Sequence, residues 1–131
     1  MANLQATTIS GPVTHKEGTV ATSGTTLTLD LSTGSSFEVD MSSFTTGNIN
    51  TLTVLNQTSG LANEQHHRSF LLQVTQHTQS RNFAWSSINN VKWPGGTAPT
   101  LTTTNDKKDI YSFTTWDNGT TWYARIIGQN Y

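Results

Sequence analysis

The clearest structural signal in the chain is DIYSFTTWDNGTTWYARIIG, residues 109–128. Apolar and polar side chains alternate through residues 109–116 and again through residues 120–128, which is the period of a half-buried β-strand. The intervening Asp-Asn-Gly, residues 117–119, is typical of a tight turn. This stretch therefore predicts a β-hairpin.

The same alternation recurs upstream, and no segment has the 3.6-residue period of a helix. The predicted strands lie at residues 25–31, 37–41, 50–56, 70–75, 83–85 and 91–93. Strands separated by turn signals every ~8–12 residues favour an all-β fold, specifically an antiparallel two-sheet sandwich that is jelly-roll-like. Residues 1–24 read as an extended N-terminal arm or edge strand, and residues 25–131 as the sandwich domain.

Composition narrows the range of possible functions. The 131 residues suit one domain, and charged residues make up only 11% of them, with a net charge of −1. The seven Lys and Arg residues are scattered along the chain, which argues against nucleic-acid binding. The sequence has no apolar run near the ~20 residues that cross a bilayer, and no Cys for disulfides or thiolate metal sites. A surface with so little charge tolerates dense subunit packing.

The C-terminal half contains several distinctive short sequence motifs. They are QVTQHTQSRNFAW at 73–85, KWPGGTAPTLTTT at 92–104, KKDIYSF at 107–113, DNGTTWY at 117–123 and the ending GQNY. Together they resemble a C-terminal domain of bacteriophage tail-fibre and other virion structural proteins, notably from phages of aquatic bacteria. The resemblance covers residues 25–131, and its WPGG string marks a structural turn without chemistry.

The resemblance implies a non-enzymatic virion structural protein that forms an oligomer, commonly a trimer. Because the sequence starts at Met1 and only residues 1–24 precede the domain, we expect no fibre shaft. We therefore expect an accessory or decoration protein at the virion surface, docked on the major capsid protein or on a tail component. Two alternatives stay open: a tail-fibre or baseplate tip that binds host-surface glycans, and a free lectin-like or glycan-processing protein.

Three groups of residues are candidates for contact. Apolar positions of the N-terminal segment would form a docking arm: Leu4, Ile9, Pro12 and Val13. A polar loop relatively rich in charge would form an exposed contact tip: Asn63, Glu64, His66, His67 and Arg68. Aromatic residues of the C-terminal half would form an interface or a glycan surface: Trp93, Trp116 and Tyr123. For the third group, an interface or plain surface is favoured over a glycan site.

Catalytic and metal sites are the weaker interpretation. Glu38 and Asp40 lie two apart on one predicted strand face, as a glycosidase pair requires, but that face is expected to be solvated. His66 and His67 are adjacent, and neighbouring side chains of an extended chain point to opposite sides. We therefore expect no enzyme activity, no metal and no cofactor.

Overall fold

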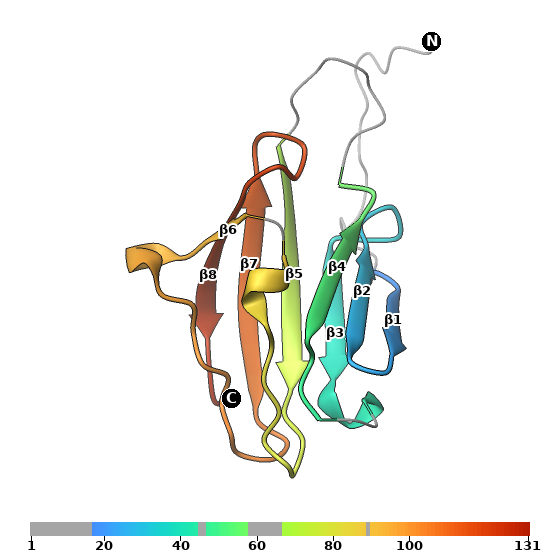
Figure 1. The fold of residues 1–131 in the computed structure, drawn as a ribbon, viewed down its shortest axis with the longest axis vertical. Helices are drawn as coiled ribbons and strands as arrows, with labels where there is room; N and C mark the ends of the chain where they lie inside the picture. Colours follow the sequence, from blue (N-terminus) through green and yellow to red (C-terminus); the bar gives the residue numbers. More distant parts are fainter. Residues whose placement is uncertain (1–16, 45–46, 58–66, 89) are drawn as a thin grey trace, which may run out of the picture.

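The computed structural model describes residues 17–44, 47–57, 67–88 and 90–131. These residues form strands and three one-turn 3-10 helices (Figure 1). In chain order they are β1 (Val20–Ser23), β2 (Thr26–Asp30), β3 (Ser36–Asp40), η1 (Met41–Ser43), β4 (Thr51–Leu55), β5 (Arg68–Thr75), η2 (Trp85–Ser87), β6 (Val91–Lys92), η3 (Pro94–Gly96), β7 (Lys108–Thr115) and β8 (Trp122–Gly128). The all-β class predicted from the sequence is confirmed. None of the described segments is a helix long and apolar enough to cross a lipid bilayer.

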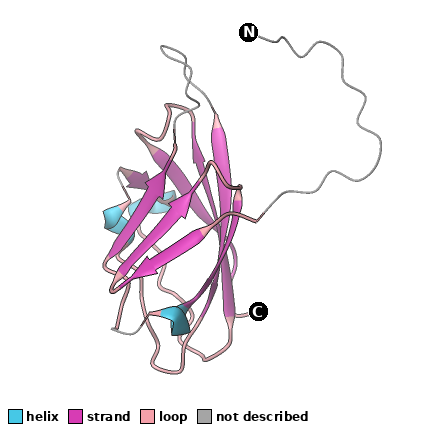
Figure 2. Ribbon diagram, turned by 90° about the vertical axis from the view of Figure 1, so that its right-hand side faces the viewer, coloured by secondary structure: helices cyan, strands magenta, loops and turns pink. Residues whose placement is uncertain are grey.

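The strands form two sheets, which lie in two layers (Figure 2). The smaller sheet has the order β1-β2-β4, and the larger one has the order β3-β5-β7-β8-β6. From β2 to β5 each successive strand changes sheet. The predicted hairpin is present as the antiparallel pair β7 and β8, with a β-bulge between Ile110 and Tyr111. Residues 20–23, inside the segment predicted to be an arm or an edge strand, form edge strand β1.

The expectation of purely antiparallel sheets is wrong. β2 pairs with β4, β3 with β5 and β6 with β8 in parallel, so both sheets are mixed. Parallel neighbours need a crossover connection, which is usually a helix. For the pairs β2–β4 and β3–β5 a strand of the opposite sheet fulfils that role, since β3 lies between β2 and β4 in the chain and β4 lies between β3 and β5.

The predicted strand at residues 83–85 is also absent. Phe83 makes only an isolated bridge to Ile49, and Trp85 begins the 3-10 helix η2. The Ser87 hydroxyl donates to the Ala84 carbonyl and accepts from the backbone N–H of Leu52, each at 2.7 Å. This local bonding replaces a strand ladder, because short polar side chains compete for backbone groups.

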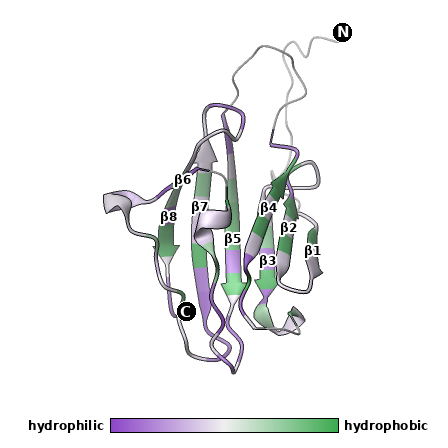
Figure 3. Ribbon diagram, in the orientation of Figure 1, coloured by the Kyte–Doolittle hydropathy of each residue, from purple (hydrophilic) through white to green (hydrophobic). Residues whose placement is uncertain are grey.

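Both sheets contribute to one hydrophobic core, which is consistent with a β-sandwich. Leu27 and Leu29 of β2 are fully buried, as are Phe37 of β3 and Trp122 of β8. The Phe70 ring stacks on Phe113 at a centroid distance of 4.7 Å. Hydrophobic residues lie along the strands, whereas the turns beyond β5 and before β7 are mostly hydrophilic (Figure 3).

Candidate functional site

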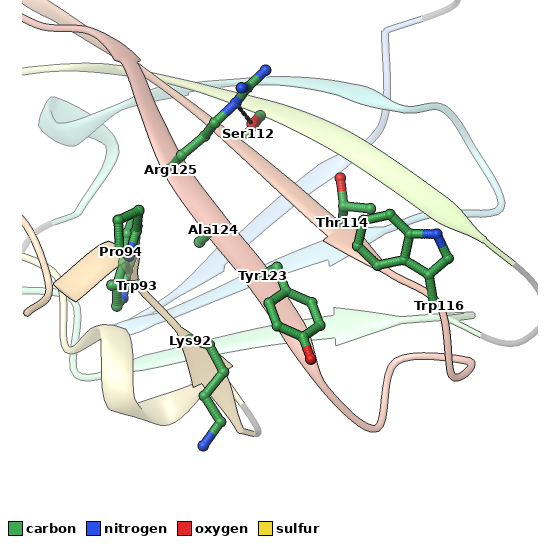
Figure 4. A pocket seen from close by; sticks show the side chains of 9 residues that line it. All are labelled: Lys92, Trp93, Pro94, Ser112, Thr114, Trp116, Tyr123, Ala124 and Arg125. Atoms are coloured by element: carbon green, nitrogen blue, oxygen red, sulfur yellow. Dashed lines mark hydrogen bonds between the residues drawn. The ribbon is translucent and has the colours of Figure 1, made fainter. Parts of the chain in front are cut away.

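An open groove of about 580 Å³ straddles β8 at one edge of the five-stranded sheet. Alternation along β8 buries Trp122 and Ala124 and leaves Tyr123 and Arg125 exposed on the outer face of that sheet. We call this hollow the aromatic groove (Figure 4). Its lining residues are Lys92, Trp93, Pro94, Ser112, Thr114, Trp116, Tyr123, Ala124 and Arg125. The groove thus joins the β7–β8 hairpin to the β6–η3 segment.

Two exposed aromatic rings form one side of the groove. Trp116 is 57% exposed and Tyr123 is 54% exposed. Their ring centroids lie 5.8 Å apart with planes at 68°, an edge-to-face arrangement. The His67 ring lies 5.2 Å from the Trp116 ring. The structure therefore brings together residues from two predicted groups, the polar loop and the aromatic surface.

The turn between β7 and β8 fixes the position of Trp116. The Asp117 carboxylate accepts hydrogen bonds from the Thr121 backbone N–H and the Thr115 hydroxyl, each at 2.8 Å. These bonds, the Thr121 N–H first, hold the pKa of Asp117 below its ordinary value. The Gly119 N–H in turn donates to the Thr115 hydroxyl at 2.9 Å. A turn with this many internal bonds presents Trp116 in a preorganised position.

Trp93, the third predicted aromatic, has a different role. It is half-buried and packs edge-on against Trp85, with ring centroids 5.3 Å apart, and also against Tyr111. Its indole Nε1 is buried and has no hydrogen-bond acceptor among the described residues. Trp93 is therefore a wall of the groove anchored in the core, whereas Trp116 and Tyr123 form its exposed aromatic side.

The polar groups of the groove are cationic or neutral. Lys92 and Arg125 supply the charge, and no carboxylate is among the described lining residues. The Arg125 Nε donates to the Ser112 hydroxyl at 3.3 Å. The Thr114 hydroxyl bonds that of Ser69 on the neighbouring strand at 2.9 Å. Exposed rings with hydroxyls and cations suit binding by packing and hydrogen bonds, as in protein interfaces.

The exposed apolar surface continues beyond the groove. Leu71 of β5 and Ile127 of β8 are 42% and 48% exposed. Both line a neighbouring hollow of about 550 Å³, which shares Ser112, Thr114 and Arg125 with the aromatic groove. We call this hollow the central hollow. The two hollows give the outer face of the five-stranded sheet a continuous surface of apolar side chains and hydroxyls over β5, β7 and β8.

Of the other predicted contact residues, Arg68 is described and does not line the groove. The whole docking arm lies outside the described residues, as does most of the polar loop: Leu4, Ile9, Pro12, Val13, Asn63, Glu64 and His66. Arg68 begins β5, and its guanidinium donates to the backbone carbonyls of Leu31, at 3.0 Å, and Asn56. Arg68 therefore ties β5 to the ends of β2 and β4.

Glu38 and Asp40 are exposed on the outer face of β3, as predicted. With Glu17 they line a third hollow of about 440 Å³, the acidic hollow, into which Lys108 also reaches. The Ser42 hydroxyl and backbone N–H hold the pKa of Asp40 below its ordinary value, the opposite of what a general acid needs. No group of three or more His, Asp or Glu residues in the described ranges is placed to hold a metal ion.

Sequence reasoning did not single out Lys92 and Arg125 as site residues. Alternation along β8 could have indicated Arg125, because side chains two positions apart on a strand, such as Tyr123 and Arg125, point to the same face. The contact between His67 and Trp116 joins strand ends 49 positions apart (116 − 67), and no local pattern reports it.

No family model, no curated protein and no solved structure matches this chain.

Proposed function

We propose that this protein is a non-enzymatic structural component of a bacteriophage particle. In this proposal it docks as an oligomer on the capsid surface, against the major capsid protein, or on a tail component, and so resides on the virion surface. The proposal takes the phage context from the resemblance of residues 25–131. It takes the mode of action from the exposed binding surface.

One observation carries the docking function: exposed Trp116 and Tyr123 stand beside Arg125 on a continuous apolar and hydroxyl-bearing face. Trp, Tyr and Arg are the residue types that dominate binding energy at protein interfaces. A well-ordered exposed Trp–Tyr pair has no evident use in stabilising the chain itself. An interface with another protein would bury it.

The test is imaging of intact particles that carry a tagged form of the chain. We expect tag density at regular capsid positions. The double variant Trp116→Ala/Tyr123→Ala should leave particles undecorated, while Leu55→Ala should decorate them normally. Leu55 is the matched control because it is 44% exposed on β4 of the other sheet. Particles without any of the wild-type chain would contradict the proposal.

A second candidate function is that of a tail-fibre or baseplate tip that binds a host-surface glycan. It is favoured by the ring faces of Trp116 and Tyr123 beside the hydroxyls of Ser112 and Thr114, because sugars pack on aromatic rings and bond to hydroxyl groups. In that case the purified chain should compete with particles for host adsorption. Glycan binding without particle association would instead indicate a free lectin-like protein.

Three finer features remain proposals. One is a jelly-roll-like path of the strands. Another is an extended arm within residues 1–24 that anchors the chain. The third is the oligomeric assembly itself, for which the resemblance implies a trimer. Deleting residues 1–12 should abolish attachment while leaving the thermal unfolding temperature unchanged, and unchanged incorporation into particles would refute the arm.

A further inference from the structure

We propose that the outer face of the five-stranded sheet docks against the same face of a second copy of this chain, about a two-fold axis. The inference rests on the proposed function, in which the chain docks on the particle as an oligomer, and it assigns this face to the contact between copies. It is carried by the charges at the two ends of the face and by the uncharged surface between them.

The two ends of the face carry opposite charge. At the β3 end, Glu17, Glu38 and Asp40 line the acidic hollow, and Lys108 leaves it net negative. At the other end, Lys92 and Arg125 line the aromatic groove without a described carboxylate. In the sheet order, β5 and β7 lie between β3 and β8. The two ends are therefore about 14 Å apart across the strands, at roughly 4.8 Å per strand.

The surface between the ends carries no charge until it reaches Arg125 of the basic end. Ser69 and Leu71 of β5 and Ser112 and Thr114 of β7 line the central hollow, and Arg125 and Ile127 of β8 line its far side. These side chains point away from the core, because their neighbours Phe70, Leu72 and Phe113 are buried. An apolar and hydroxyl-bearing centre can pack against an identical centre without placing like charges together.

A two-fold axis in the plane between two such faces, perpendicular to the line that joins the acidic end to the basic end, exchanges their ends. The acidic hollow of one copy then meets Lys92 and Arg125 of the other, and the same contact forms a second time. The central hollows meet on the axis. Such an isologous contact, in which one patch serves both partners, is the commonest way in which protein copies associate.

Charge complementarity favours a copy of this chain over a partner of a single charge sign. A polyanion would be attracted to Arg125 but repelled by Glu38 on the same face, and a polycation would meet the reverse. A second copy satisfies both ends at once. The assembly that this surface predicts is a dimer, which departs from the trimer implied by the resemblance.

The test uses the full chain and measures self-association by sedimentation equilibrium and native mass. One variant reverses the basic end, Lys92→Glu/Arg125→Glu, and another reverses the acidic end, Glu17→Lys/Glu38→Lys. Asp40 stays unchanged because its carboxylate caps η1 through Ser42. Lys107→Glu is the control, since this residue lines neither of the two charged hollows.

We expect each double variant to dimerise at least about tenfold more weakly than the wild type, because like charges then face one another. An equal mixture of the two variants should recover dimers, now composed of one copy of each. Lys107→Glu should associate as the wild type does. Raised salt should weaken the wild-type dimer and the mixed dimer alike.

A wild-type monomer, a wild-type trimer, or a mixture that does not recover association would overturn the inference. Circular dichroism establishes that each variant is folded, and the single exchanges Arg125→Glu and Glu38→Lys repeat the test if a double variant does not fold. These outcomes are separate from the proposed function. A monomer that still decorates capsids would refute the dimer and leave the docking role intact.

Discussion

The Tyr123 ring lies edge-on to the Trp116 ring, with centroids 5.8 Å apart, although more than half of each side chain is exposed to solvent. An exposed aromatic pair ordered in this way loses little conformational freedom when a partner covers it. The pair is therefore suited to recognition, and we expect it to contribute little to the stability of the domain.

Truncation of a buried tryptophan should destabilise the domain far more than truncation of an exposed one. Trp122 is fully buried and its Nε1 donates to the Gln57 side-chain carbonyl at 3.0 Å. Trp122→Ala should lower the free energy of unfolding by ~3–5 kcal/mol, whereas Trp116→Ala should change it by less than about 1 kcal/mol. Urea denaturation followed by circular dichroism measures both. Equal losses would contradict the assignment of Trp116 to the binding surface.

Phe70 and Trp85 extend that comparison to the rest of the aromatic core. Phe70 is 1% exposed and Trp85 is 5% exposed. Truncation of either to Ala should lower the free energy of unfolding by ~3–5 kcal/mol, because a cavity replaces a well-packed ring. Leu55→Ala, at an exposed apolar position, is the control for loss of apolar surface alone.

Asp109 ties the C-terminal residues to the sheet. It is buried, and its carboxylate accepts hydrogen bonds from Thr102 N–H and hydroxyl at 2.7 and 2.6 Å, and from Asn130 N–H at 3.0 Å. Gln129 Nε2 and the Tyr111 hydroxyl complete the set of donors. Burial alone would raise the pKa of Asp109, but these bonds, those from Thr102 first, hold it below the ordinary 3.8.

A lowered folded-state pKa makes the contribution of Asp109 dependent on pH in a defined direction. The stabilisation is fully present above about pH 4 and is lost as the pH falls through the folded-state pKa. Asp109→Asn should cost ~2–3 kcal/mol at pH 7, because an amide cannot accept from all of the donors. Urea titrations at pH 7 and pH 2.5 should show the gap between variant and wild type narrowing at low pH. A gap that widens would be inconsistent with this role.

Gly119 should tolerate no side chain. Its φ is +82°, and a Cβ there would lie 2.3 Å from the Oε1 of Gln57, the acceptor for Trp122. Gly119→Ala should therefore destabilise the domain through both backbone strain and displacement of Gln57, by roughly 2–4 kcal/mol. Gly96→Ala is the matched control. Gly96 has a φ of +75° but nothing near its Cβ position, so only the strain component, about 1 kcal/mol, should appear.

The buried amide of Gln76 organises the loop after β5. Its Nε2 donates to the carbonyls of Thr102 and Arg81 at 2.7 and 2.8 Å, and its Oε1 accepts from the N–H groups of Arg81 and His77. Gln76→Leu should lower the free energy of unfolding by at least about 2 kcal/mol, because buried backbone groups lose their partners. Gln73→Leu on the outer face should cost less than about 1 kcal/mol in the same assay.

Period-two alternation predicted most of the strands, because burial of every second side chain is a local property of the chain. Leu27 and Leu29, Phe37 and Val39, and alternate residues of the hairpin such as Tyr111, Phe113, Trp122 and Ala124 are buried, as the pattern indicated. The same pattern does not say which strand becomes the neighbour. Leu27 pairs with Leu52 and Phe37 with Leu72 in parallel, and only long-range packing decides those registers.

The candidate site was predictable in part for the same reason. The alternation of side chains along a strand placed Tyr123 and Arg125 on one face of β8, and the structure has them there. The approach of His67 to Trp116 and of Lys92 to the groove depends on how loops return to the sheet. Trp93 looked like a surface aromatic in the sequence, but its packing against Trp85 requires knowledge of where η2 lies.

Between β2 and β5 the chain passes from one sheet to the other at each step. This topology affects how the chain reaches its native state. Neither layer can be completed by residues adjacent in sequence, and β5 finds its second neighbour only when β7 is available. Contacts so distant along the chain slow the acquisition of structure. On the ribosome, the domain would therefore become ordered late and nearly all at once, after its final hairpin has emerged.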